Sequence, residues 1–291
     1  MKKKKLNMEN ISYKLSLIPG AVYMIVFFII PLAILISYSF FKNKGYGRVE
    51  HTFTLENYID FFTTPYYLQT FLGSFVMAVV VSLLAILISY PLAFYIVRYK
   101  GFKANLVSSL IMVPMLASAV VTCFGWYIML GQTGIINSAL LKMHLIEAPV
   151  QFLYTRGGVY IVLLAGQLPY MTTSIMNGIA SIDENVENAA RTLGAEPAKT
   201  FFTVTLPLSL PGISAGTLLV FTGVLSAYVV PIVIGGGKIN TLSSLIVNQA
   251  STTLNWPKAA VMAFLLMVMS TLAMFLNNKL MESKRIGGGG R

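Results

Sequence analysis

The chain has 291 residues, of which 56% are hydrophobic and only 11% are charged. This composition excludes a soluble domain of ordinary make-up. The net charge of +11 does not require a nucleic-acid partner, because much of it lies beside the ends of apolar stretches, where anionic membrane lipid attracts basic side chains. The chain is therefore expected to be a membrane protein.

Six stretches contain no Asp, Glu, Lys or Arg: 15–41, 61–97, 104–141, 157–182, 200–237 and 259–278. A helix needs about 20 apolar residues to cross a hydrocarbon core of about 30 Å. Because a helix satisfies its own backbone groups in lipid, the sequence predicts an all-α membrane protein with six transmembrane helices. They are expected at roughly 17–41, 70–97, 106–130, 158–181, 207–234 and 259–278.

The distribution of basic residues predicts the orientation in the membrane. Six spans place both termini on one side. The N-terminus, the 98–103 loop, the 182–205 loop and the tail together hold 14 of the 21 Lys and Arg residues. Because basic residues favour the cytoplasmic side, both termini are expected in the cytoplasm. The predicted domains are a basic N-terminus (1–16), a transmembrane domain (17–281) and a flexible cytoplasmic tail (282–291).

The outer loops are expected to contain two short interfacial helices. One follows Thr54 and is amphipathic, and the other runs from about Ile135 to Met143. Within the fifth span, Gly212, Ala215, Gly216 and Gly223 provide a small-residue face that allows another helix to approach closely.

The chain offers no residues for catalysis. No predicted span holds an ionisable side chain, which disfavours a proton-driven secondary transporter but leaves sodium coupling through carbonyl groups open. His51 and His144 have no metal-ligand spacing, and the Gly235–Lys238 stretch lacks the residues of a phosphate-binding loop. We expect no enzyme activity, no metal site and no cofactor bound by this chain.

Hydrogen-bonding side chains cluster in the fourth and fifth spans. A lipid-facing helix would not carry so many, so the set either bonds neighbouring helices or lines a translocation path. The path candidates are Gln167, Tyr170, Thr173, Asn177, Thr222, Ser226 and Tyr228. A cationic substrate could pass along carbonyl groups and the faces of Tyr170 and Tyr228.

The polar stretch 182–205 has the strongest local signals. Asp183 is a suitable N-cap, and Glu184 and Glu187 oppose the positive end of a helix. That helix is expected to end near Leu193, with Gly194 in the left-handed conformation. Pro197 suits the first turn of a second helix, expected to end at Leu206-Pro207. Glu187 and Arg191, four residues apart, could pair along the helix or meet charges on a partner.

The spacing Ala189-Ala190, three residues, Gly194, nine residues, Val204-Thr-Leu206-Pro207 resembles the cytoplasmic "EAA" loop of binding-protein-dependent ABC importer permeases of the type I fold. Two residues depart from the family pattern, since Asn188 stands at the usual Glu and Val204 at the usual Ile. The resemblance implies a coupling helix pair between spans four and five that meets an ATPase. It implies an ATPase-contacting set of Glu187, Asn188, Ala189, Ala190, Arg191, Gly194, Leu206 and Pro207.

Two further segments are similar to the polyamine/opine-type branch of these permeases. One is Gly131…Gly134…Asn137 leading to Pro149, and the other is Ser226-Ala-Tyr228-Val-Val-Pro231 with Asn255-Trp256-Pro257. Polyamine permeases often carry an acid where Ser226-Ala-Tyr228 stands here. The resemblance favours a polyamine or opine-like amine as substrate, with sugar or ferric iron as alternatives.

The resemblance also implies partners and a location. These are a second permease subunit, similar or identical, two ATPase subunits that hold ATP and Mg, an external solute-binding protein and the lipid of a bacterial inner membrane, with no nucleic acid. A secondary transporter or channel, and a membrane scaffold without solute flux, are the rival expectations.

Overall fold

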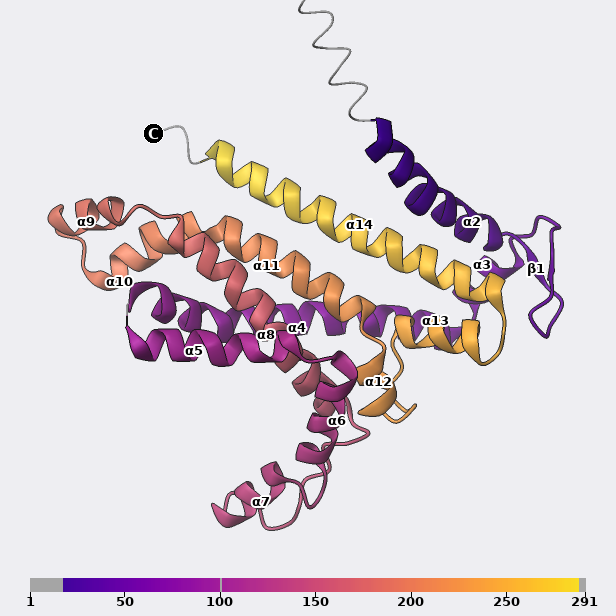
Figure 1. Cartoon of the computed structure of the whole chain (residues 1–291), viewed down its shortest axis with the longest axis horizontal. Helices are drawn as coiled ribbons and strands as arrows, with labels where there is room; N and C mark the ends of the chain where they lie inside the picture. Colours follow the sequence, from indigo (N-terminus) through magenta and orange to yellow (C-terminus); the bar gives the residue numbers. More distant parts are fainter. Residues whose placement is uncertain (1–17, 100, 288–291) are drawn as a thin grey trace, which may run out of the picture. The chain divides into compact units, whose positions relative to one another are not determined.

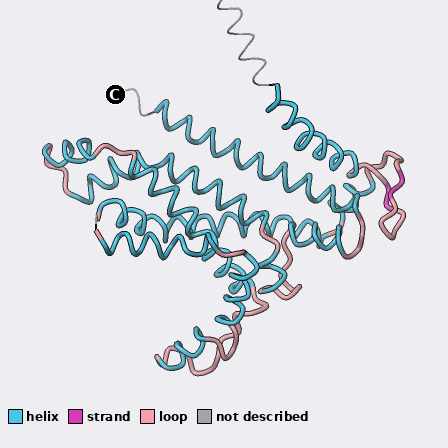
Figure 2. Tube along the Cα trace, viewed as in Figure 1, coloured by secondary structure: helices cyan, strands magenta, loops and turns pink. Residues whose placement is uncertain are grey.

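The computed structural model describes residues 18–99 and 101–287. The basic N-terminus predicted over 1–16 lies outside the described residues, as do 288–291. Helices make up most of the described chain, and loops connect them (Figure 2). Six helices in the described part are long and apolar enough to cross a membrane, as predicted: Ile18–Tyr38, Pro65–Arg98, Ala119–Lys142, Arg156–Ala180, Pro197–Ser226 and Trp256–Lys279.

The chain folds into two compact units. Of the described residues, unit 1 holds 18–64 and Ile246–Leu265, and unit 2 holds 65–99, 101–245 and 266–287. Two helices, α13 (Leu242–Ser251) and α14 (Trp256–Gly287), begin in one unit and end in the other. No local feature of the sequence indicated this division, and the predicted domain boundaries stay predictions.

In unit 1, side chains of α3 (Glu56–Thr63) form hydrogen bonds with the chain that follows the first span. The Asn57 amide donates to the carbonyls of Ser39 and Phe41 at 3.2 and 2.8 Å, and the Tyr58 hydroxyl lies 2.7 Å from Ser39 Oγ. The predicted amphipathic helix is thus present as α3. The strands β1 (Lys42–Asn43) and β2 (Val49–Glu50) form an antiparallel hairpin, which was not predicted because two-residue strands are too short for an alternating pattern.

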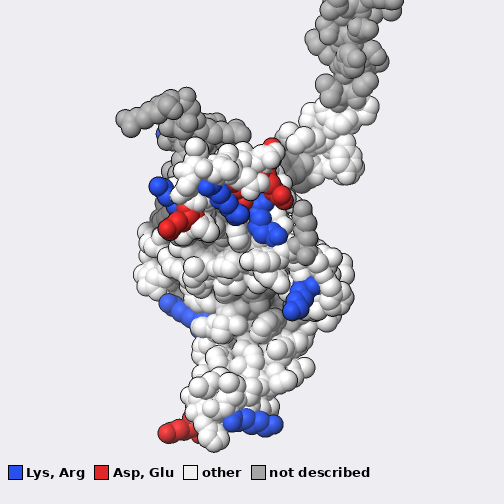
Figure 3. Space-filling model, turned by 90° about the vertical axis from the view of Figure 1, so that its left-hand side faces the viewer, with Lys and Arg blue, Asp and Glu red and all other residues white. Residues whose placement is uncertain are grey.

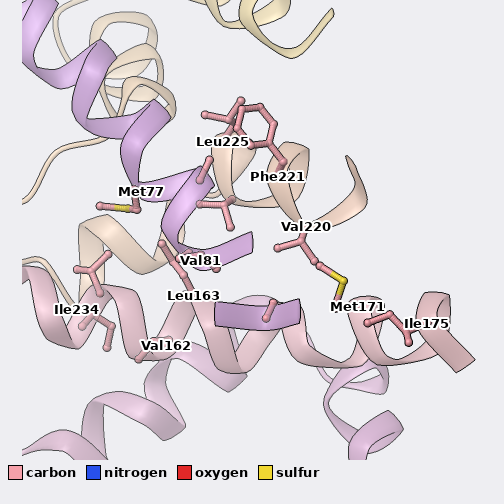
Figure 4. Packing of buried hydrophobic residues seen from close by; sticks show 14 of the residues in the cluster. Met77, Val81, Val162, Leu163, Met171, Ile175, Val220, Phe221, Leu225 and Ile234 are labelled. Atoms are coloured by element: carbon pink, nitrogen blue, oxygen red, sulfur yellow. The ribbon is translucent and has the colours of Figure 1, made fainter. Parts of the chain in front are cut away.

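The core of unit 2 is formed by three membrane helices, α4 (Pro65–Arg98), α8 (Arg156–Ala180) and α11 (Leu206–Ser226). Figure 4 shows Met77 and Val81 of α4 against Leu163 of α8 and Leu225 of α11. These side chains are almost completely buried. Because lipid is as apolar as the core, such contacts stabilise the bundle by close packing more than by exclusion of water.

Glycines set how closely α8 and α11 approach. A Cβ on Gly212 would lie 2.8 Å from the Cα of Gly178, and a Cβ on Gly216 would lie 2.7 Å from the sulfur of Met171. Further along, a Cβ on Gly223 would lie 2.8 Å from the Gln167 side-chain oxygen. The prediction that small residues of the fifth span allow close helix contact is confirmed for these three glycines, whose partner is α8. Ala215, predicted on the same face, is exposed.

The predicted third span, 106–130, is not one helix. The chain forms α5 (Phe102–Met112), a 3-10 turn (Val113–Leu116) and then α6 (Ala119–Leu130). Pro114 lacks the amide needed to continue the helix. Ala117 is extended, and Ser118 starts α6 by accepting a hydrogen bond from the amide of Val120 at 3.3 Å.

The predicted fifth span, 207–234, is also interrupted. Helix α11 ends at Ser226, Ala227 is extended, and a short helix, α12 (Val229–Val233), follows. Pro231 cannot donate to the Ala227 carbonyl as a continuing helix would require. Ser243 Oγ lies 2.9 and 2.8 Å from the carbonyls of Leu225 and Ala227 and so supplies the missing donor.

Two prolines are preceded by π-helical turns. The turn Ile25–Ile29 lies just before Pro31 and α2 (Ile30–Tyr38), and the turn Phe201–Thr205 lies just before Pro207 and α11. A proline leaves the carbonyl four residues earlier without its usual donor, and a wide turn allows local rearrangement at that position. The prolines in α4 and α8 have no such turn.

The last helix is longer than predicted. Helix α14 continues to Gly287, so its backbone extends into the segment 282–291 expected to be a flexible tail. In unit 2, its Asn277 amide donates to Ser214 Oγ of α11 at 2.6 Å.

Candidate functional site

The stretch between α8 and α11 forms two short helices joined at a glycine. Helix α9 (Glu184–Thr192) begins at Asp183, whose carboxylate accepts a hydrogen bond from the Asn185 amide at 2.9 Å. Gly194 has φ +86°, and α10 (Pro197–Thr200) follows (Figure 1). The N-cap, the left-handed glycine and the proline at the start of the second helix are all as predicted.

The second helix does not end at Leu206-Pro207 as predicted. It continues through the π turn Phe201–Thr205 into α11 without a break. Leu206 packs against the core of unit 2, whereas Pro207 is exposed in the first turn of α11. Leu206 is half-buried, so Pro207 is the more exposed of the two residues.

Glu187 is the buried residue of α9. Its carboxylate forms an ion pair with Arg98, the last residue of α4, and accepts a hydrogen bond from Thr205 Oγ1 at 2.8 Å. The pairing of Glu187 with Arg191 considered from the sequence is therefore not what the structure contains. Glu187 holds α9 against the rest of unit 2 instead of facing outward.

Most of the other predicted ATPase-contacting residues in α9 and at its end are exposed. Asn188, Ala189, Arg191 and Gly194 are exposed, and Ala190 is half-buried. Leu193, which was not in the predicted set, is 89% exposed. A hollow of about 280 Å³ lies between α9 and the end of α4 and is lined by Phe94, Arg98, Tyr99, Glu184, Glu187, Asn188 and Arg191.

Charged side chains of both signs are gathered on the end of unit 2 that carries α9 and α10 (Figure 3). They include Glu184, Arg191 and Lys199. A mixed charged surface with an exposed leucine can bind a polar protein partner through ion pairs around an apolar contact.

A second cavity, of about 370 Å³, is lined by four of the seven predicted translocation residues. Gln167 and Tyr170 of α8 line it together with Ser226 and Tyr228 at the break after α11. Pro114, Met115 and Ala117, from the break before α6, line the other side. Both helix interruptions therefore open onto the same cavity.

Three predicted path residues do not line this cavity. Thr222 Oγ1 donates to the carbonyl of Leu218 in its own helix at 2.7 Å. Asn177 is exposed nearer the end of α8, and Thr173 is half-buried. The hydroxyl of Thr222 is therefore satisfied by a hydrogen bond within its own helix.

Sequence reasoning missed Arg98 and Thr205. Arg98 was counted only as a basic residue beside the membrane. A usable signal was present, because Tyr90, Phe94 and Arg98 recur every four residues and so share one face of α4. The partner of that face could not be read from the sequence.

Comparison with known proteins identifies the family. Residues 18–285 match the family described as binding-protein-dependent transport system inner membrane component. The chain belongs to this family. The permease is 31% identical to the spermidine/putrescine transport system permease protein PotB of Haemophilus influenzae over 265 residues, covering 90% of this chain and 92% of the relative. It is 29% identical to PotB of Escherichia coli, covering 88% and 96%.

Solved structures share the fold. A chain of a bacterial alginate ABC transporter, in complex with an alginate-bound periplasmic protein, superposes with a TM-score of 0.76 at 15% identity, covering 99% of both chains. A chain of the inward-facing MetNI methionine ABC transporter superposes with a TM-score of 0.59 at 14% identity, covering 76% of the permease and 99% of that chain.

These findings establish the class of protein. The permease is the multi-pass inner-membrane subunit of a binding-protein-dependent ABC importer, and ATP hydrolysis belongs to a separate subunit. Such permeases work with a binding protein and an ATPase. A secondary transporter or channel is not favoured.

Proposed function

We propose that this permease carries a polyamine or a similar small amine into the cytoplasm. The observation that supports this substrate is the relation to the spermidine/putrescine permeases over about nine-tenths of the chain. Sugar and ferric iron, which the sequence left as alternatives, have no such support among these relatives.

The proposed path for the amine is the cavity that Gln167, Tyr170, Ser226 and Tyr228 line. Among the described residues, no charged side chain lines it, so a cation would be held weakly. The rings of Tyr170 and Tyr228 would attract the ammonium groups by cation–π interaction, and backbone carbonyls at the breaks beside Ala117 and Ala227 would accept hydrogen bonds. Weak binding suits transport, because a tightly held substrate would be released slowly.

The proposed coupling element is the α9–Gly194–α10 pair. Asn188, Ala189, Arg191 and Leu193 would contact an ATPase, with Leu193 as the apolar anchor and Arg191 as the charged contact. Glu187 is proposed to hold α9 in position through its contacts with Arg98 and Thr205. ATP and Mg would be bound by two such ATPases, and a second permease subunit, similar or identical, would complete the membrane channel.

Gly194 provides the test of coupling. At φ +86° a β-branched residue is strongly disfavoured, whereas asparagine tolerates this conformation. In vesicles that contain the permease with its ATPase, its second permease subunit and its binding protein, we expect Gly194→Val to abolish ATP-driven spermidine uptake and Gly194→Asn to retain most of it. Both variants should insert normally.

Two results would contradict the proposal. Uptake by the wild-type complex without ATP would indicate a channel or secondary transporter. Full ATP-driven uptake by Gly194→Val would mean that the geometry at this residue does not matter for coupling.

A further inference from the structure

Three residues from three elements are in contact on the side of α9 that faces the rest of unit 2. Arg98 ends α4, Glu187 lies in α9, and Thr205 lies in the π turn that leads into α11. We call this group the α9 anchor. Glu187 accepts from both other residues, and the side chains of Glu187 and Arg98 are only 9% and 15% exposed.

A buried ion pair is a poor choice if stability alone is required. Removing two charges from water costs several kcal/mol per ion, and an apolar replacement of similar volume is often as stable. The Nε of Arg98 is also buried without a hydrogen-bond partner in the described part of the chain. Such a pair does fix geometry, because a carboxylate and a guanidinium bond only in defined orientations.

The α9 anchor is the buried attachment of α9 to the side of the bundle. Apart from Glu187, the side chains of this helix are exposed or half-buried. The chain enters α9 through the turn at Ser181–Asp183 and leaves it through Gly194. Both connections can bend, so without the α9 anchor the helix could pivot when pulled.

The same face of α4 continues the contact towards the membrane. The Tyr90 hydroxyl lies 2.9 Å from Ser209 Oγ of α11. The Phe201 ring packs edge-on against Tyr90 and Phe94, with centroids 5.5 and 5.6 Å apart. One end of α4 is therefore joined to the start of α11 along two helical turns, and the α9 anchor is the point where α9 joins both.

We propose that Arg98 and Glu187 are positioning residues that carry the displacement of α9 directly into α4, so that force from an ATPase moves α4 and α11 together. This inference rests on the proposed coupling role of α9. Without the ion pair, α9 would still bind an ATPase through its exposed side chains, but its movement would be taken up by bending at Gly194.

The test measures the number of substrate molecules transported per ATP hydrolysed by the complete complex in vesicles. For Glu187→Gln and Arg98→Gln we expect this ratio to fall by at least about tenfold, with ATP hydrolysis and ATPase binding close to wild type. Thr205→Val, which removes only the hydroxyl donor, should cause a smaller fall in a normally assembled complex. The exchanged pair Arg98→Glu with Glu187→Arg should recover part of the loss.

A control variant removes a different ion pair, which lies in unit 1. Glu50→Gln breaks the ion pair of the half-buried Glu50 with the exposed Lys44, 3.2 Å apart, and should leave the ratio unchanged. Wild-type ratios in Glu187→Gln and Thr205→Val would overturn the inference, as would failure of assembly in all the variants, including the exchanged pair. If instead cross-linking from Arg191→Cys, in a complex with no other change at α9, finds no ATPase on this helix, the proposed function itself fails.

Discussion

At the scale of single residues, α8 and α11 approach closely because the residues between them include glycines, which have no side chain. A Cβ on Gly212 would lie 2.7 Å from the carbonyl oxygen of Ser174, which belongs to the backbone and cannot rotate away. We expect Gly212→Ala to destabilise the permease by about 1–3 kcal/mol, the usual cost of overpacking. Thermal unfolding in detergent would measure this.

The control for Gly212 is another glycine within a helix. A Cβ on Gly125 of α6 would meet no atom within 4 Å, so Gly125→Ala should be neutral or slightly stabilising. Equal melting temperatures for the two variants would show that the α8–α11 distance is not limited by Gly212.

A second residue-scale prediction concerns Asp60 in unit 1. Its carboxylate lies 2.6 Å from Lys258 Nζ, and the hydrogen bond from that ammonium lowers the pKa of Asp60 below its ordinary value of 3.8. A lowered pKa stabilises the fold at pH values above 3.8, and this contribution disappears as the pH falls through the folded-state pKa.

The effect should be small, because the Asp60 side chain is 42% exposed and water screens the pair. We expect Asp60→Asn to lower stability by less than about 1 kcal/mol near neutral pH. The difference from wild type should shrink below about pH 4. Unfolding curves of both proteins across this range would check it, and a difference that persisted at lower pH would contradict the role of the carboxylate charge.

At the scale of elements, the break between α11 and α12 depends on a side chain from a later segment. Ser243 is buried and lies within hydrogen-bonding distance of the Leu225 and Ala227 carbonyls. We expect Ser243→Ala to leave these carbonyls without that donor and to cost about 1–3 kcal/mol. Hydrogen exchange of the backbone amides just after the break should also become faster.

The matched control is Ser270→Ala. Ser270 Oγ donates to the Leu266 carbonyl of its own helix, at 2.9 Å, and that carbonyl keeps its backbone partner within α14. The loss should therefore be small. If both serine variants have the same stability, the hydroxyl of Ser243 does not maintain the break.

At the scale of the whole molecule, the distribution of basic residues predicts that α9 is cytoplasmic and that the loop after α12 is external. Cys123 is the one cysteine of the chain and is buried, so a Cys123→Ala background is suitable for labelling. In intact cells, a membrane-impermeant maleimide should label Lys238→Cys and should label Arg191→Cys only after permeabilisation. The opposite pattern would overturn the orientation.

The sequence alone was sufficient to predict features that depend on the residues of one short segment. Stretches without charge predicted the number of spans and the positions of four of them, because burial in lipid excludes ionisable side chains wherever a helix crosses. The predicted third and fifth spans ran across interruptions in the helices. Asp183, Gly194 and Pro197 located the two short helices, because capping and left-handed geometry depend on the residue at the position itself. The small face of α11 was recognised in the same way.

The tertiary structure decided which distant groups meet. Glu187 lies 89 residues after Arg98 in the chain, and no local pattern of α9 distinguishes a carboxylate that supports the helix from one that faces a partner. The interruptions at Ala117 and Ala227 were equally hidden, because a proline in a membrane helix is tolerated or not according to the donors nearby. For Ala227 that donor is Ser243, so the shape of the cavity depends on contacts that exist only after the chain has folded.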